Sequence, residues 1–209
     1  MTLGAALAAY VVAAGLLTLT PGLDTALILR TAAVEGPRRA FLAALGITAG
    51  CLVWGAAVAV GLGALLTASQ TAYAILKWAG AAYLAWLGLN LLVKPRRAFD
   101  PAAAPASAAS GARGWFFRGL MTNLLNPKVG VFYVSFLPQF TPDGFPAAPF
   151  IFGLAALHGV MGTVWAVALI AATRPLSTAL RRPGVVTWLD RVTGGVFLAF
   201  AGRLALSRG

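Results

Sequence analysis

Ionisable side chains stand shortly after two prolines, inside otherwise apolar stretches of this sequence. Asp24 lies three residues after Pro21, and Lys128 directly follows Pro127. A charge at membrane depth is costly unless it meets water or a partner, and proline removes a backbone donor and interrupts a helix. A carboxylate in such a place could hold an ammonium or carry a proton, and an ammonium could hold a carboxylate. The pattern therefore favours a binding site over a lipid-facing helix.

Each proline also belongs to a sequence that is typical of a helix start. Asn is a favoured N-cap and Pro a favoured first helical residue, as in Asn126-Pro127. Thr20-Pro21 has the same pattern, because Thr is also a common N-cap. The sequence thus predicts two membrane helices that stop and restart, with Thr20 and Asn126 as caps. Two such breaks in corresponding parts of two halves indicate the binding site of a transporter. The predicted substrate-binding and pathway residues are Thr20, Pro21, Gly22, Asp24, Asn123, Asn126, Pro127 and Lys128.

Composition predicts an all-α membrane protein. Of the 209 residues, 60% are hydrophobic and 10% are charged, whereas soluble domains carry roughly 25% charged residues. Apolar runs of roughly 20 residues or more, enough to span a bilayer, recur along the chain, so about six transmembrane helices fit. We expect the first to be a retained span and not a signal peptide. The predicted spans are residues 3–33, 40–66, 73–93, 115–140, 147–173 and 185–206.

The positive charge is placed at the ends of these spans. The net charge is +11, and its expected partner is the lipid surface of the inner leaflet, not nucleic acid. Basic connections follow the first, third and fifth spans, which by the positive-inside rule puts them in the cytoplasm and both termini outside. Arg203 and Arg208 run against that orientation.

An internal repeat organises the predicted spans. Residues 77–88 align without gaps with residues 191–202, cation on cation and aromatic on aromatic, and the two proline breaks recur in the same order. Because each unit holds three spans, the copies must have opposite orientation, which is a 3+3 inverted-topology repeat. The expected units are 1–94 and 114–209, and the Ala/Pro-rich basic segment 95–113 is expected to be a flexible loop.

Distances along the chain put both breaks near the bilayer midplane. Pro21 lies nine residues from Arg30, and Pro127 lies nine residues from Arg118. At about 1.5 Å per residue, each break is roughly 13 Å from the cytoplasmic boundary. The helices that begin at the breaks could then direct their N-termini into one cavity, which suits a carboxylate. With Asp24 alongside, the simplest ligand is a zwitterion such as an amino acid.

The same residues admit structural interpretations. Either proline alone is often only a kink in a membrane helix. Asp24 and Lys128 could form an ion pair with no transport role, and Asn123 and Asn126 could join helices by hydrogen bonds. His158 could pack or hydrogen-bond inside the bundle, or it could relay protons. Four tryptophans are expected to be packing or interface anchors more often than pocket walls: Trp54, Trp78, Trp86 and Trp165.

Several classes of function lack the residues they need. No Walker sequence, Gly-rich dinucleotide fingerprint or HExxH occurs, so neither an enzyme nor a cofactor is predicted. Cys51 is the only cysteine and His158 the only histidine. We therefore expect Cys51 to pack as a small apolar residue, and we predict no metal site.

The motifs together resemble the signatures of the LysE/RhtB family of amino-acid exporters, over essentially the whole chain. One departure is Leu23, where the family usually has a second proline, which should soften the first break. The matching residues are Thr20-Pro21-Gly22 with Asp24, Gly36 before basic residues, Gly46 and Gly50, Lys77, Gly80, Tyr83, Leu84, Gly88, Asn126-Pro127-Lys128 and Phe136-Leu137-Pro138-Gln139-Phe140.

This resemblance implies a multi-pass exporter of the bacterial inner membrane that moves an amino acid or derivative outward, driven by the proton-motive force. Asp24 is then the candidate for the coupling proton, and the partners are the small-molecule substrate, protons and membrane lipids. The wider superfamily includes thiol–electron carriers and cadmium exporters, which the single cysteine and sparse ligand set do not suit. The small residues Gly46 and Gly50 permit a homodimer. Two alternatives stay open: an uncoupled membrane channel, and a scaffold or assembly protein with no transported ligand.

Overall fold

The computed structural model describes residues 2–68, 70–95, 111–142, 144–173, 178 and 182–206. The described part is helical and contains no strand, which confirms the all-α prediction. The elements in chain order are α1 (Leu3–Leu19), α2 (Leu23–Val34), α3 (Pro37–Ala68), α4 (Gln70–Val93), α5 (Gly111–Leu124), α6 (Pro127–Phe136), the 3-10 helix η2 (Leu137–Phe140), α7 (Ala147–Ala171) and α9 (Pro183–Leu206).

The first predicted break separates α1 from α2, whose axes meet at 51°. The cap predicted for it was wrong, because Gly22 is the N-cap of α2 and Thr20 is instead the C-cap of α1. The Thr20 hydroxyl donates to the carbonyl of Leu16, four residues back, a bond that Thr often makes to its own helix. Pro21 therefore precedes the new helix and does not begin it.

The second predicted break separates α5 from α6 and has the predicted cap. Asn126 is the N-cap of α6, and its Oδ1 accepts a hydrogen bond from the backbone N–H of Lys128 at 3.1 Å. Pro127 is the first helical residue, where its missing N–H costs nothing. The difference between the two breaks has a simple cause, since Asn has a side-chain acceptor for the first turn and Gly22 has none.

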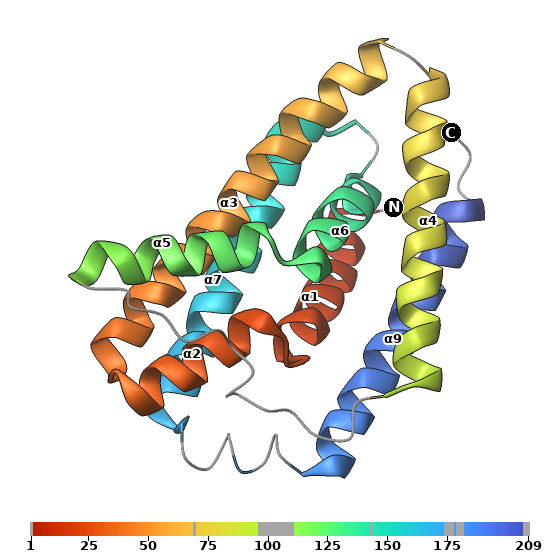
Figure 1. Cartoon of the computed structure of the whole chain (residues 1–209). Helices are drawn as coiled ribbons and strands as arrows, with labels where there is room; N and C mark the ends of the chain where they lie inside the picture. Colours follow the sequence, from red (N-terminus) through yellow and green to blue (C-terminus); the bar gives the residue numbers. More distant parts are fainter. Residues whose placement is uncertain are drawn as a thin grey trace.

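Helix α3 packs against both α5 and α7, and α5 crosses it at close range (Figure 1). Small residues allow this approach. A Cβ atom at Gly46 would overlap the backbone carbonyl of Phe116, and one at Gly119 would overlap the carbonyl of Ala43. The close helix approach predicted at Gly46 is thus confirmed, and it brings the end of α5 to the middle of the protein.

Helices α1 and α6 lie between the α3/α7 pair and the α4/α9 pair (Figure 1). Buried aromatic rings join them: Tyr10 of α1 lies 6.3 Å from the ring of Phe132 on α6, and it meets Phe140 of η2 edge-on at 5.2 Å. The Tyr10 hydroxyl also donates to the carbonyl of Leu154 on α7 at 2.7 Å. This core fixes the two helices whose ends form the breaks.

Two of the described helices contain segments long and apolar enough to cross a membrane, Pro37–Gly61 and Ala147–Ala171, and the bent α1/α2 pair makes a third if it is one span. The six-span inverted repeat remains a prediction. The two helices that carry the repeated motif, α4 and α9, pack side by side. Of the expected loop, residues 96–110 lie outside the described residues, and α5 begins at Gly111, earlier than the expected boundary.

Candidate functional site

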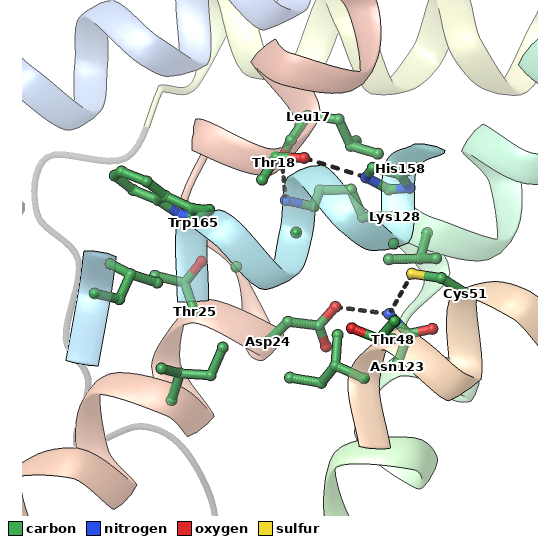
Figure 2. A pocket seen from close by; sticks show the side chains of 17 residues that line it. Leu17, Thr18, Asp24, Thr25, Thr48, Cys51, Asn123, Lys128, His158 and Trp165 are labelled. Atoms are coloured by element: carbon green, nitrogen blue, oxygen red, sulfur yellow. Dashed lines mark hydrogen bonds between the residues drawn. The ribbon is translucent and has the colours of Figure 1, made fainter. Parts of the chain in front are cut away.

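A cavity of about 60 Å³ lies where the two helix breaks meet (Figure 2). Four of the predicted site residues line it: Gly22, Asp24, Asn123 and Lys128. The other four, Thr20, Pro21, Asn126 and Pro127, form the breaks beside it and do not line it. Further lining residues that can hydrogen-bond are Thr18, Thr25, Thr48, Cys51, His158 and Trp165.

Asp24 stands in the first turn of α2, where the helix dipole favours a carboxylate. Asn123 of α5 donates through Nδ2 to Asp24 Oδ2 at 2.9 Å. The other oxygen, Oδ1, is buried and has no hydrogen-bond partner among the described residues. Leaving a buried polar atom unpaired costs on the order of 1–3 kcal/mol, and more for a charged group. The carboxylate is therefore suited to accept a proton or a cationic ligand group.

Lys128 belongs to the second break, but its side chain reaches the first. Its Nζ donates to the carbonyl oxygen of Leu17 at 3.1 Å and to that of Thr20 at 2.8 Å. These carbonyls end α1, and a helix C-terminus carries a partial negative charge. The ammonium therefore caps α1 while it also lines the cavity.

Gly22 makes room for this arrangement. A Cβ atom at this position would lie 3.1 Å from Lys128 Nζ, tighter than ordinary van der Waals contact. Because Gly22 also lacks a side chain that could cap α2, the N–H groups in the first turn of α2 receive no side-chain acceptor from it. The N-terminus of α2 thus keeps its capacity to bind an anionic group, beside the Lys128 ammonium.

Helix α7 contributes a side of the cavity that was not predicted from the sequence. His158, Gly162, Trp165 and Leu169 follow one another at helical spacing, share one face of α7, and line the cavity. Because α7 is apolar on all sides, no periodicity in hydrophobicity marks this face. The seven-residue spacing of its histidine and tryptophan is the one signal that could have indicated it.

His158 is hydrogen-bonded through both ring nitrogens. Nδ1 lies 2.9 Å from the hydroxyl of Tyr133, and Nε2 lies 3.2 Å from the hydroxyl of Thr18. The Thr18 hydroxyl donates its hydrogen to the carbonyl of Ala14, so it must accept from Nε2–H. In a neutral ring, Nδ1 then accepts from the Tyr133 hydroxyl. The side chain therefore ties α7 to α1 and α6 and orders one side of the cavity.

Cys51 and the remaining donors offer no ordinary metal site. Cys51 is buried in the apolar core and lines the cavity, and Asn123 Nδ2 lies 3.7 Å from its Sγ. Within the ranges that the structure describes, no group of three His, Cys, Asp or Glu side chains is arranged to hold a metal ion. The polar groups of the cavity instead combine a carboxylate, an ammonium and an uncapped helix N-terminus, which match a small zwitterion.

Comparison with known proteins identifies a family of translocators. Residues 16–208 match the family model described as LysE type translocator. A homoserine/homoserine lactone efflux protein of Salmonella typhimurium is 32% identical over 203 residues, 96% of each chain. Threonine efflux proteins of Salmonella typhi and of Escherichia coli strain K12 are each 29% identical, over 91% of this chain and 92% of theirs. No solved structure matches the chain.

Proposed function

Because the chain belongs to the LysE type translocator family, we propose that it is a secondary transporter of the inner membrane that exports an amino acid or a close derivative. In this proposal the export is coupled to proton antiport, and Asp24 carries the proton. The relatives named for efflux of threonine, homoserine and homoserine lactone match this chain over more than nine-tenths of its length. Threonine and homoserine are zwitterions, which is the chemistry that the polar groups of the cavity suit.

One observation carries the proposal. Asp24 lines the cavity between the helix breaks, and its Oδ1 is buried without a hydrogen-bond partner in the described part of the chain. An ionisable group inside a membrane segment is costly and is usually retained for function. In the proposed cycle, Asp24 receives the substrate ammonium when that site is loaded and a proton when the substrate has left, which couples the two fluxes.

The opposite end of the substrate is proposed to bind where positive charge gathers. The substrate carboxylate would face the uncapped N-terminus of α2 and the Lys128 ammonium. This ammonium is bonded to two carbonyl oxygens of α1, and Lys128 also lines the cavity. At the second break the Lys128 N–H is already taken by Asn126. The two breaks therefore have unequal roles in the proposal, with α2 as the main anion site and α6 as the carrier of Lys128.

The size of the cavity supports a closed state. Its volume is about 60 Å³, whereas a cavity that binds benzene measures on the order of 150 Å³. An amino acid with a four-carbon skeleton therefore needs the surrounding helices to separate before it can enter. We propose that the two three-helix units rock about the breaks to open the cavity to one side at a time.

Counterflow in proteoliposomes tests this function. Vesicles that contain purified protein would be preloaded with one unlabelled amino acid, and uptake of its labelled form measured with and without a pH gradient. We expect saturable exchange that responds to the gradient in the wild type, and loss of gradient-driven transport in Asp24→Asn. The matched control is Glu35→Gln, because Glu35 pairs with Arg39 in an exposed i,i+4 contact outside the cavity.

Three results would separate the alternatives. Full gradient-driven transport in Asp24→Asn would remove Asp24 from the mechanism. Flux that follows the substrate gradient and ignores both the pH gradient and uncouplers would identify a channel. Absence of exchange for every amino acid and derivative tried, with the protein shown to be folded, would favour a scaffold.

A further inference from the structure

We propose that the end of the cavity formed by Trp165, Thr25 and Gly162 receives the substrate side chain and selects one that carries a hydroxyl or carbonyl oxygen. This inference rests on the proposed transport of an amino acid, and it adds which residues distinguish one side chain from another. Neither Trp165 nor Gly162 was among the residues that the sequence marked as a site.

The cavity has two chemically different ends. Trp165 and Thr25 lie together on one side of Asp24, and His158 and Cys51 lie on the other (Figure 2). Around Trp165 the packing is apolar, since its indole rests against the buried cluster that includes Ile28, Leu29 and Leu169. If the ammonium of an amino acid binds Asp24, its side chain can occupy the apolar end of the cavity beside Trp165.

Trp165 adds a hydrogen-bond donor to that end of the cavity, which the Thr25 hydroxyl also lines. Its Nε1–H is buried and has no hydrogen-bond partner among the described residues. Indole N–H is a donor only, and an unpaired buried donor costs on the order of 1–3 kcal/mol. A hydroxyl or carbonyl oxygen on the substrate side chain would satisfy it, whereas an apolar side chain of the same shape would leave it unpaired. Sites built in this way reject the apolar analogue strongly.

Gly162 leaves room for the substrate side chain. It lines the cavity one turn before Trp165, and a Cβ atom placed on it would meet no atom within 4 Å. The missing side chain therefore contributes open space to the cavity and is not needed for close helix packing. A methyl group at this position would project into that space and shorten the room beside the indole ring.

The decisive experiment compares substrates that differ only in the oxygen. Threonine and valine are nearly isosteric, as are homoserine and norvaline, and each pair competes for counterflow in proteoliposomes. We expect the wild type to prefer the hydroxylated member of each pair, and Trp165→Phe to reduce that preference about tenfold, because Phe keeps the ring and removes the donor. The matched control is Trp54→Phe, since Trp54 Nε1 is also buried without a hydrogen-bond partner in the described part of the chain but does not line the cavity.

A second variant tests the size limit and does not depend on tryptophan. Gly162→Ala should fold at least as well as the wild type, because Ala is favoured over Gly in helices by about 1 kcal/mol and the added methyl meets no atom. It should reduce transport of homoserine and norvaline more than transport of alanine. Gly153→Ala is the control, since Gly153 stands on the same helix with equally open space and lies outside the cavity.

The outcomes distinguish this inference from the transport function. If the wild type exchanges amino acids but both variants keep its preferences for oxygen and size, the assigned side-chain site is wrong and the transporter stands. If Trp165→Phe does not accumulate, Gly162→Ala alone tests the site, and equal transport of homoserine, norvaline and alanine relative to the wild type would contradict it. If the wild type exchanges no amino acid at all, the proposed function fails and this inference falls with it.

Discussion

The ammonium of Lys128 lies 2.8 Å from the carbonyl oxygen of Thr20, so a residue of the second helix break caps the helix that ends at the first. The reverse contact also exists, because Asn123 at the end of α5 holds the Asp24 carboxylate at the start of α2. Each break is thus completed by a side chain from the other half of the chain. Both contacts lie beside the cavity, which Asp24, Asn123 and Lys128 line.

Removing the Lys128 ammonium should weaken the fold as well as transport. In Lys128→Met, the carbonyls of Leu17 and Thr20 lose their donor inside an apolar region, at a cost of about 1–3 kcal/mol. We expect the midpoint of thermal unfolding in detergent to fall by several degrees and amino-acid counterflow to be lost. Tryptophan fluorescence during heating would measure the first effect, and proteoliposome counterflow the second.

Lys128→Arg is the control for that variant, because a guanidinium keeps the charge and can donate to both carbonyls. It should recover most of the thermal stability. An unfolding midpoint for Lys128→Met equal to that of the wild type would show that the contact with α1 contributes nothing to stability. Unchanged counterflow with lowered stability would instead restrict Lys128 to a structural role.

Local sequence was enough to predict where the helices break, but not what the side chains at the breaks contact. Asn126-Pro127 carries its own cap, so the start of α6 follows from neighbouring residues alone. At Thr20, a hydroxyl that was expected to cap the next helix bonds back to the previous one. Both bonds are open to a threonine at a helix boundary, so the residue type alone does not decide between them.

Contacts between distant residues were beyond the sequence. Asp24 and Asn123 are separated by 99 positions, and neither the spacing nor the residue types indicated that the amide would meet the carboxylate. The α7 side of the cavity was missed for a different reason. On a helix that is apolar all round, Gly162 and Trp165 look like packing residues, and only the neighbouring helices show that they border a cavity.

Close packing of α5 on α3 should make Gly119 intolerant of even one methyl group. A Cβ atom there would overlap the carbonyl of Ala43 on α3, so Gly119→Ala must push the helices apart, at a cost of about 1–3 kcal/mol. We expect a lower unfolding midpoint in detergent. Counterflow should also fall, because the shift moves Asn123 on α5 away from Asp24.

Gly61→Ala provides the comparison, since a Cβ atom at Gly61 on α3 meets no atom of the described residues within 4 Å. The intrinsic preference of helices for Ala predicts an equal or higher midpoint for this variant. We therefore predict that Gly119→Ala lowers the unfolding midpoint and that Gly61→Ala does not. A midpoint for Gly119→Ala at or above that of Gly61→Ala would refute the close contact.

The hydrogen bonds around His158 predict one tautomer of its ring. Thr18 can only accept from Nε2–H, because its own hydrogen goes to the carbonyl of Ala14, and Nδ1 accepts from Tyr133. His158 is the only histidine in the chain, so ¹⁵N-histidine labelling gives one unambiguous pair of ring signals in lipid nanodiscs. We expect a neutral ring protonated at Nε2 at pH 7.

In Tyr133→Phe, Nδ1 loses its hydrogen-bond donor, so the ring signals should broaden or shift. Tyr10→Phe is the control, because it removes a hydroxyl that is bonded to the carbonyl of Leu154, and it should leave the ring signals unchanged. A doubly protonated ring in the wild type would contradict this network, because Nδ1–H would then have to donate to Tyr133.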